Sequence, residues 1–384
     1  MFRHLTSSRF AVIYHPISPK SHIRMASRSS APGILREISR GDLSLGAANS
    51  IVCKTGFKAL GSYNWLDKPE PTILVPGSPP KWTPRPTETQ LTPDAGHVLI
   101  DQNAHRCPDH PLEPLFRALL TNNPAIDLTT IDLVTDRNNL RKLLRFVSNQ
   151  DDKPFTIRVQ RLGTTTLFTR TEPKSSEHIT GFRGFGHEFE KAYTSWPRGM
   201  ENSTGHNRIV QYNLCGLKLV VRFEVDASTH VGTVVDADTL SSLLGGVSLA
   251  PVCDSTTFHV TRRGTLVPQE SVLEIKTRAV SRTLDLADVL PQLWFSETPA
   301  LAVGYHSRGR FGSVKPEKMD LEGWERNNAP MLRKLVEMLR VIVKEAEKAE
   351  GRRCVVQGMG DGTLRIVKGS AVDCLPGDIK AKFQ

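Results

Sequence analysis

The sequence predicts an α+β fold of mixed, largely antiparallel, twisted β-sheets with flanking helices. Two observations lead to this prediction. Several segments alternate apolar and polar residues and come in pairs around a glycine, which is the pattern of β-hairpins. Segments with the helical spacing of apolar residues precede and separate these pairs. With 384 residues, 39% hydrophobic and 23% charged, the composition is typical of a soluble globular protein with a sizeable core.

The first part of the chain is rich in proline and glycine. We therefore expect residues 37–112 to wrap over the domain, and residues 68–90 to be too broken for helices. Helical spacing then predicts helices in "LEPLFRALLTN" and "DRNNLRKLLRFVSN". Residues 155–170 follow with alternating polarity, and they predict a hairpin that turns near Gly163.

The second part of the chain predicts further strands and a long helix. Residues 207–227 read as a hairpin that turns near Gly216, and "VLEIKTRAV" and "ALAVGYHSRGRF" as strands. The segment "DVLPQLWFSETP" between these strands should begin as a helix. Residues 317–350 predict a long amphipathic helix interrupted at Pro330, and residues 353–369 a closing hairpin with an Asp-Gly turn.

The first 36 residues differ in composition from the rest. They contain many serines and no Asp or Glu, and their basic residues are Arg3, Arg9, Lys20, Arg24, Arg28 and Arg36. This composition is typical of a disordered basic arm or of a targeting segment. We expect residues 37–384 to form a single domain.

Charge and cysteine content limit the partners and the compartment. A net charge of +10 favours polyanionic partners such as nucleic acid. No apolar run approaches the ~20 residues that a membrane span needs, so we expect no membrane partner. Six cysteines without a CxxC pair favour a reducing compartment. We expect the nucleus, and leave the cytoplasm and mitochondrial targeting by residues 1–36 open as alternatives.

Two predicted strands each carry charged residues on one face. In "VVRFEVDA" (220–227), Glu224 and Asp226 share a face, because side chains alternate along a strand. In "VLEIKTR" (272–278), Glu274 and Lys276 share a face in the same way. Taken alone, either strand could simply have a wet face. Together they suggest one site.

The order strand with EVD, strand with EIK, helix, strand is that of a PD-(D/E)XK-type nuclease core. Hydrolysis of a phosphodiester or pyrophosphate at neutral pH needs divalent ions that activate water and neutralise the leaving oxygen. Two carboxylates ~4 Å apart repel each other by roughly 4 kcal/mol at an effective dielectric of 20, so such a cluster calls for a cation. Mg²⁺ or Mn²⁺ suits these oxygen ligands better than zinc.

These residues resemble the motifs of the DXO-like (RAI-type) decapping nuclease family, which acts on RNA 5′ ends. The family's metal site combines a Gly-x-x-x-Glu helix, an acidic-hydrophobic-Asp strand and a Glu-hydrophobic-Lys strand. This chain has "GHEFE" (186–190), "EVD" (224–226) and "EIK" (274–276) in that order. The resemblance covers about 130–315, and residues 234–255 look like an insertion into it.

The resemblance implies a role for each matching residue. The metal ligands, directly or through water, would be Glu190, Glu224, Asp226, Glu274 and the carbonyl of Ile275. The catalytic residues would be Glu274, Lys276 and Gln292. Lys276 and Gln292 would also position the substrate, together with Arg137, whose guanidinium would grip phosphate oxygens.

Some of these roles have alternatives in the sequence itself. Glu188 competes with Glu190, depending on the register of the helix. Gln292 could instead lie on a helix surface. Arg137 is flanked by Asp136 and Asn138, where the family has an aromatic residue and a glycine.

By this resemblance, the protein would be a metal-dependent hydrolase of capped, triphosphorylated or NAD-linked RNA 5′ ends, with 5′→3′ exoribonuclease activity and an exoribonuclease partner as further expectations. Two alternatives stay open: a PD-(D/E)XK-type DNA nuclease, and a catalytically weak subunit that binds nucleic acid or stabilises a partner. The last would use a basic face that comprises Lys315, Lys318, Arg326, Arg333, Lys334 and Arg340. Lys276 favours an enzyme, because a binding scaffold needs no lysine among the acids.

Overall fold

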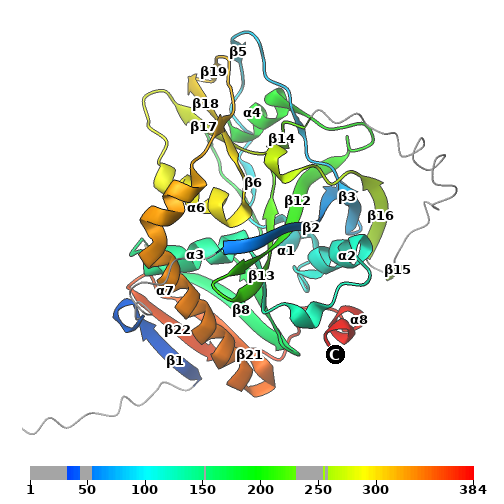
Figure 1. Cartoon of the computed structure of the whole chain (residues 1–384). Helices are drawn as coiled ribbons and strands as arrows, with labels where there is room; N and C mark the ends of the chain where they lie inside the picture. Colours follow the sequence, from blue (N-terminus) through cyan, green and yellow to red (C-terminus); the bar gives the residue numbers. More distant parts are fainter. Residues whose placement is uncertain (1–32, 44–53, 151–152, 231–253, 256–257) are drawn as a thin grey trace, which may run out of the picture. The chain divides into compact units, whose positions relative to one another are not determined.

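Two large twisted β-sheets form the centre of the computed structural model (Figure 1), which describes residues 33–43, 54–150, 153–230, 254–255 and 258–384. In the order in which they pair, the strands of the 12-stranded sheet are β1 (Ile34–Ser39), β22 (Thr363–Lys368), β21 (Arg353–Gly358), β8 (Phe155–Leu162), β9 (Thr165–Thr171), β7 (Leu133–Asp136), β13 (Leu217–Glu224), β12 (Ser203–Leu214), β2 (Lys54–Leu66), β3 (Thr72–Gly77), β16 (Phe258–Gly264) and β15 (Asp254–Ser255). Most of these pairs are antiparallel, which confirms the predicted fold class.

The second sheet has eight strands. In order they are β11 (Thr194–Ser195), β4 (Lys81–Trp82), β14 (Ala227–Ser228), β17 (Val272–Ala279), β18 (Ala300–Ser307), β19 (Arg310–Phe311) and β5 (Thr89–Gln90), and β20 (Glu317–Lys318) pairs with β18. A separate ribbon consists of β6 (His97–Leu99) and β10 (Ser176–His178). The chain enters the second sheet directly from β13, so the two sheets meet where that strand ends.

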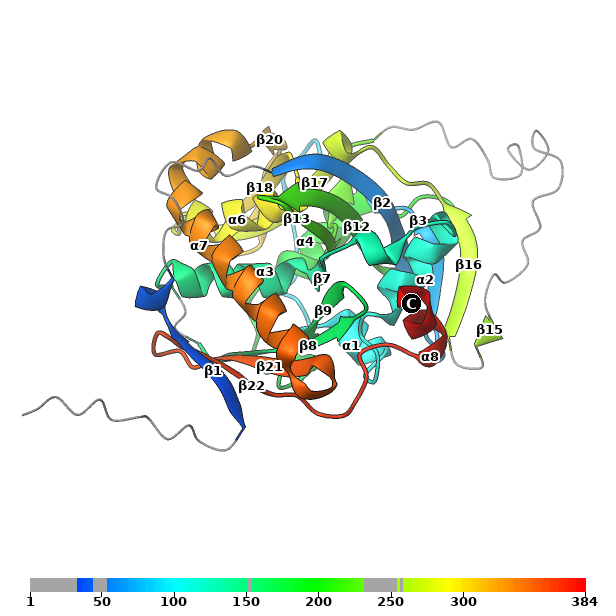
Figure 2. The same cartoon turned by 60° about the horizontal axis from the view of Figure 1, so that its bottom comes forward.

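Helices flank these sheets. Their bounds are α1 (Gln102–Arg106), α2 (Glu113–Asn122), α3 (Arg137–Val147), α4 (Gly186–Tyr193), α6 (Leu286–Ser296), α7 (Leu321–Lys348) and α8 (Gly377–Lys380). Helix α7 lies across β8 and β21 and also contacts α3 and α6 (Figure 2). None of the helices in the described ranges is long and apolar enough to cross a membrane.

The predicted hairpins are confirmed. β8 and β9 pair around Gly163, β12 and β13 around Gly216, and β21 and β22 around the turn with Gly362. These three glycines have φ values of 54°, 91° and 88°, a region that glycine enters without a steric cost. The predicted helices also form, as α2, α3 and the start of α6.

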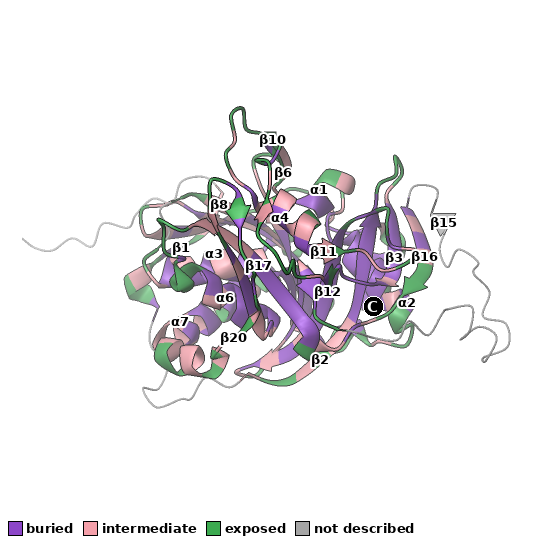
Figure 3. Ribbon diagram, turned by 90° about the horizontal axis from the view of Figure 1, so that it is seen from above, coloured by how far each residue is buried: buried purple, intermediate pink, exposed green. Residues whose placement is uncertain are grey.

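The prediction that residues 37–112 wrap over the domain is wrong. This segment contributes β2 and β3 to the interior of the large sheet, where β2 pairs with both β12 and β3. Tyr63, Trp65 and Ile73 are fully buried there. Figure 3 shows β12 and β3 largely in the colour of buried residues. The burial of these large side chains outweighs the local signal of the glycines and prolines.

The predicted interruption at Pro330 is also wrong, because α7 continues through it. A proline inside a helix costs roughly 3 kcal/mol, whereas one fully buried leucine returns about 1.5–3 kcal/mol. The buried residues of α7 are Leu332, Leu335, Val336, Met338, Leu339, Ile342 and Ala346. Packing of this face therefore holds the helix together across the proline.

The first described strand overlaps the end of the predicted basic arm. Residues 1–32 lie outside the described residues, but Ile34–Ser39 form β1, which pairs with β22 at the edge of the large sheet. The end of the arm at residue 36 is therefore corrected, because the strand begins at Ile34. Of the predicted insertion 234–255, all but Asp254 and Ser255 lies outside the described residues.

Two deletions would locate the start of the domain. Deletion of residues 1–33 should leave the melting temperature unchanged. Deletion of residues 1–39 also removes β1 and exposes the surface that buries Ile38, which is 2% exposed. This loses about 2–3 kcal/mol of burial, so the melting temperature should fall by roughly 5 °C. If deletion of residues 1–33 already lowered the melting temperature by this amount, residues before Ile34 would belong to the folded domain.

Candidate active site

Two of the candidate acids lie where the chain crosses from one sheet to the other. Glu224 is the last residue of β13 in the large sheet, and β14 of the second sheet begins at Ala227. The Val225 N–H donates to the His206 carbonyl (2.9 Å), which keeps the crossing attached to β12. Oδ2 of Asp226 accepts from the Ile275 N–H (2.8 Å) and so ties the crossing to β17.

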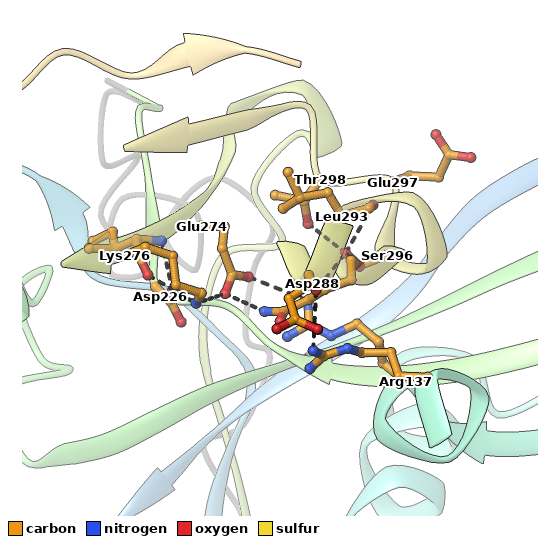
Figure 4. Close-up of polar contacts among 12 residues, drawn as sticks. Arg137, Asp226, Glu274, Lys276, Asp288, Leu293, Ser296, Glu297 and Thr298 are labelled. Atoms are coloured by element: carbon orange, nitrogen blue, oxygen red, sulfur yellow. Dashed lines mark hydrogen bonds and ion pairs between the residues drawn. The ribbon is translucent and has the colours of Figure 1, made fainter. Parts of the chain in front are cut away.

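Glu274 on β17 is the centre of a polar cluster (Figure 4). Its side chain is buried, and Oε1 accepts hydrogen bonds from Nζ of Lys276 and Nε2 of Gln292. Oε2 lies 3.4 Å from Nη1 of Arg137. Four of the predicted site residues, from β17, α6 and α3, are thus in direct contact.

Lys276 and Arg137 make further contacts besides those with Glu274. Nζ of Lys276 also donates to the carbonyl of Ile275 (3.0 Å) and lies 4.0 Å from Oδ2 of Asp226. Arg137 donates to Oγ of Ser296 (3.2 Å), and its guanidinium lies over the ring of Phe223, 5.3 Å from the centroid. Arg137 is thus directed at Glu274 and Ser296, and it also lines a cavity beside the acids.

Of the two glutamates on helix α4, Glu190 faces the other acids and Glu188 does not. Glu188 pairs with Lys191 on the surface of the helix (2.8 Å). Glu190 points into the site, where the charges of Asp226 and Glu224 act on it. The helix is fixed because the ring of Phe189 packs on Gly304 of β18, where a Cβ would approach the ring to 2.6 Å. Gly304, the glycine of the "GYH" segment, therefore lets α4 approach β18 closely enough to bring Glu190 into the site.

The pKa shifts of Glu190, Glu224 and Asp226 are opposite in direction to that of Glu274. Burial, followed by repulsion from Glu274, raises the pKa of Asp226 to about 7. Burial and the charges of Asp226 and Glu224 raise the pKa of Glu190 well above its usual value. Glu224 still touches solvent, yet its partial removal from water in the cleft raises its pKa, against the attraction of Arg137. The positive charges near these three carboxylates are too few to offset burial and repulsion, so their ionised forms are disfavoured.

Glu274 and Lys276 stabilise each other's charged forms. Burial alone would raise the pKa of Glu274, but Lys276 and Arg137 outweigh it, so the pKa is lowered. Burial alone would lower the pKa of Lys276, but Glu274 and Asp226 outweigh it and raise the pKa. Lys276 therefore stays protonated at neutral pH, where it can donate to an anionic oxygen.

The donor set fits a hard divalent cation, although the side chains do not yet surround a point where one would sit. Within the described residues, no three Asp, Glu, His or Cys side chains form a ready cation cage. Glu274 faces Lys276 and Gln292 instead. The observation that favours a cation is the raised pKa of the other three carboxylates, because excess negative charge in a cleft is what a bound Mg²⁺ or Mn²⁺ would neutralise.

A buried ion pair between Arg222 and Asp136 holds together the elements that carry Glu224 and Arg137. Arg222, two residues before Glu224, donates from Nε and Nη2 to both oxygens of Asp136 (2.6 and 3.0 Å). Its Nη1 donates to the carbonyl of Pro111 (2.8 Å). Asp136 ends β7 and directly precedes Arg137. This pair therefore fixes β13 to the start of α3, and with it the positions of Glu224 and Arg137.

Two cavities flank the acids. The larger, of about 550 Å³, is lined by Glu224 and Asp226 and by a polar wall that includes Asp101, Gln102, Asn103, Asn138, Arg170 and Asn207. The smaller, of about 320 Å³, is lined by Ile275, Lys276 and Arg278. Glu190, Gln292 and Arg141 border both. Of the four acids, Glu190 thus borders both spaces, and Glu224 and Asp226 border the larger one.

Sequence reasoning missed Arg278 and gave Arg141 no role in the site. Arg278 comes two residues after Lys276, so the strand period places it on the same face. Arg141 comes one helical turn after Arg137, so it lies on the same side of α3. Both relations are readable in the sequence, but only the fold shows that β17 and α3 border one cavity.

Comparisons with known proteins give a family and a fold. The family model described as "Domain of unknown function (DUF8563)" matches residues 38–383. No curated protein matches the chain. A crystal structure of S. pombe Rai1 is similar over 86% of this chain and 98% of that chain, with 13% identity and a TM-score of 0.58.

Two further structures are similar in the same way. Candida albicans Rai1 in complex with pU5-Mn²⁺ has 12% identity, covers 91% of this chain and 99% of its own, and gives a TM-score of 0.56. K. lactis Dxo1 in complex with manganese has 14% identity, covers 88% and 99%, and gives a TM-score of 0.51. The resemblance inferred from the motifs is thereby confirmed at the level of the fold.

Proposed function

Since the chain belongs to the DUF8563 family and has the fold of the Rai1 and Dxo1 structures, we propose that it is a metal-dependent hydrolase of RNA 5′ ends. The observation that carries this proposal is the cluster in which Glu190, Glu224 and Asp226 repel one another beside a protonated lysine. A scaffold that only binds would gain nothing from such repulsion.

The four acids, with the carbonyl of Ile275, would hold one or two divalent ions. When bound, such ions lower the pKa of a water molecule and neutralise charge on the leaving oxygen. Glu274, which contacts Lys276 in this structure, would be one of the residues that hold the ion. The Lys276 ammonium would donate to an oxygen of the scissile phosphate. Gln292, fixed on α6, orients the same phosphate or the attacking water.

The substrate class of the proposal rests on the ligands of the similar structures. Candida albicans Rai1 binds pU5 with Mn²⁺, S. pombe Rai1 binds 3′-FADP, and Scheffersomyces stipitis Rai1 binds (3′-NADP)⁺ and calcium. For this chain we propose capped, triphosphorylated or NAD-linked RNA 5′ ends. The larger cavity, with its amide and carboxylate groups, offers the hydrogen-bonding partners that a nucleotide needs.

One panel of RNAs tests the reaction. In the presence of Mn²⁺, linear RNAs with monophosphate, triphosphate, cap or NAD at the 5′ end are compared with a circular RNA of the same sequence and with double-stranded DNA. Turnover of linear RNAs and resistance of the circle are expected. Cutting of the circle, or equal cutting of DNA, would instead make the protein an endonuclease or a DNA nuclease. Absence of turnover on every substrate would favour the non-catalytic alternative.

A further inference from the structure

The smaller cavity beside the acids is lined by charged residues of both signs, of which the arginines have the fewest partners within the protein. Its cationic lining residues are Arg141, Lys276 and Arg278, and its acidic ones are Glu190, Asp285 and Asp288. Three of these groups already have partners within the protein. Lys276 contacts Glu274, Asp285 accepts from the Ala287 N–H (2.9 Å) at the start of α6, and Asp288 accepts from Nη1 of Arg145 (2.8 Å).

Arg278 lacks such a partner. It lies on the face of β17 that carries Glu274 and Lys276, and it is half-buried. Its Nε is buried and makes no hydrogen bond, and in the described part of the chain no carboxylate pairs with its guanidinium. A buried N–H of a guanidinium without an acceptor is costly, so the cavity favours an anion at this point.

Arg141 faces the same cavity from α3. Its single hydrogen bond within the described ranges goes to the main-chain carbonyl of Asp288, at 3.3 Å. The carboxylate of Asp288 is engaged by Arg145 instead. Arg141 is also half-buried, and it borders the larger cavity as well. Two guanidinium groups, from β17 and from α3, therefore border one space next to Glu190 and Lys276.

We propose that this cavity is a phosphate-binding subsite, in which Arg141 and Arg278 hold phosphate next to Glu190 and Lys276. The planar guanidinium donates two parallel hydrogen bonds to phosphate oxygens, which suits both residues to this ligand. The inference rests on the proposed function. The phosphate comes from one of two sources, either the polyphosphate of the 5′ end or a phosphodiester of the RNA strand.

Binding measurements test the subsite without turnover. With divalent ions chelated, the protein is titrated with inorganic pyrophosphate, a short single-stranded 5′-triphosphate RNA, and the same RNA with a 5′-hydroxyl. Arg141→Ala and Arg278→Ala should each weaken binding of a probe that reaches the subsite by about 10-fold or more. For RNA, the slope of log affinity against log salt should fall by about 0.7 per arginine. Arg278→Lys, which keeps the charge but not the fork, should fall between wild type and Arg278→Ala.

The matched control is Arg365→Ala. Arg365 lies on β22 at the edge of the large sheet and pairs with Glu37 (2.9 Å), so its loss removes the same charge without touching the cavity. Binding of all three probes by this variant should equal that of wild type. Melting temperatures of all variants, measured in parallel, separate a loss of binding from a loss of folding.

The probes identify the source of the phosphate. Weaker binding of pyrophosphate and of triphosphate RNA, with unchanged binding of the 5′-hydroxyl RNA, assigns the subsite to the polyphosphate. Weaker binding of both RNAs assigns it to the strand. If a folded Arg141→Ala/Arg278→Ala variant binds every probe within twofold of wild type, the subsite is refuted. If wild type binds no RNA but its pyrophosphate binding depends on these arginines, the subsite stands and the proposed function falls.

Discussion

Replacement of Glu274 by glutamine is expected to lower turnover of 5′-triphosphate RNA by about 1000-fold or more. Such a loss corresponds to about 4 kcal/mol of transition-state stabilisation. Glutamine preserves the shape of the side chain but removes the charge that holds Lys276 and Arg137 and that would bind the metal. Single-turnover kinetics with saturating Mn²⁺ measure the effect on chemistry. Retention of more than a tenth of wild-type turnover would remove Glu274 from the site.

Asp226→Asn is the matched variant, because it should be equally inactive but differ in stability. The pKa of Asp226 is raised, so its ionised form is unfavourable in the metal-free fold, and asparagine should raise the melting temperature above pH 7. The pKa of Glu274 is lowered, so its ionised form is favourable and glutamine should lower the melting temperature. Relief of repulsion is therefore expected from Asp226, not from Glu274.

The pH dependence of these two effects follows from the directions of the pKa shifts. Stability contributed by the raised pKa of Asp226 is fully present below its unfolded pKa, and is lost as pH rises through about 7. Stability contributed by Glu274 is present above its unfolded pKa and is lost as pH falls through the lowered one. Equal melting temperatures of the two metal-free variants at pH 8 would contradict this assignment of charges.

Arg222→Ala is expected to have the largest effect on stability. It should cost about 3–5 kcal/mol, a drop in melting temperature of roughly 6–10 °C, because it leaves the carboxylate of Asp136 without its buried counter-charge. Thermal unfolding followed by circular dichroism measures this change. Since the pair holds β13 to the start of α3, metal affinity should also fall in whatever fraction stays folded.

A double variant separates the ion pair from simple loss of packing. Arg222→Met/Asp136→Leu replaces both charges by apolar groups of similar size, so no unpaired charge is left inside the protein. It should recover a large part of the stability that Arg222→Ala loses. Equal instability of the double and single variants would show that the cost arises from lost volume and not from the orphaned carboxylate.

Much of the fold and part of the site were predictable because they depend on local patterns. The hairpins around Gly163 and Gly216 and the shared face of Glu274 and Lys276 on β17 follow from the two-residue period of a strand, whereas the strand predicted to continue through Asp226 ends at Glu224. The place of β2 did not follow, because its pairing with β12 joins residues far apart in the sequence. The contacts of Arg137 could not be predicted for the same reason, because its partners Glu274 and Ser296 lie on other elements, far away in the sequence. Motifs name the residues of a site, but only the fold decides which of them pair.

The passage of the chain from β13 to β14 has a mechanical consequence. Glu224 moves with the large sheet, whereas Glu274 moves with the second sheet, and only Val225 and Asp226 connect the two at this point. A divalent ion bound by both acids would therefore act as a removable cross-link between the sheets. Without the ion, Arg137 and Lys276 hold the carboxylate of Glu274, and the Ile275 N–H holds that of Asp226. Metal occupancy would then set the stiffness of the junction between the two sheets.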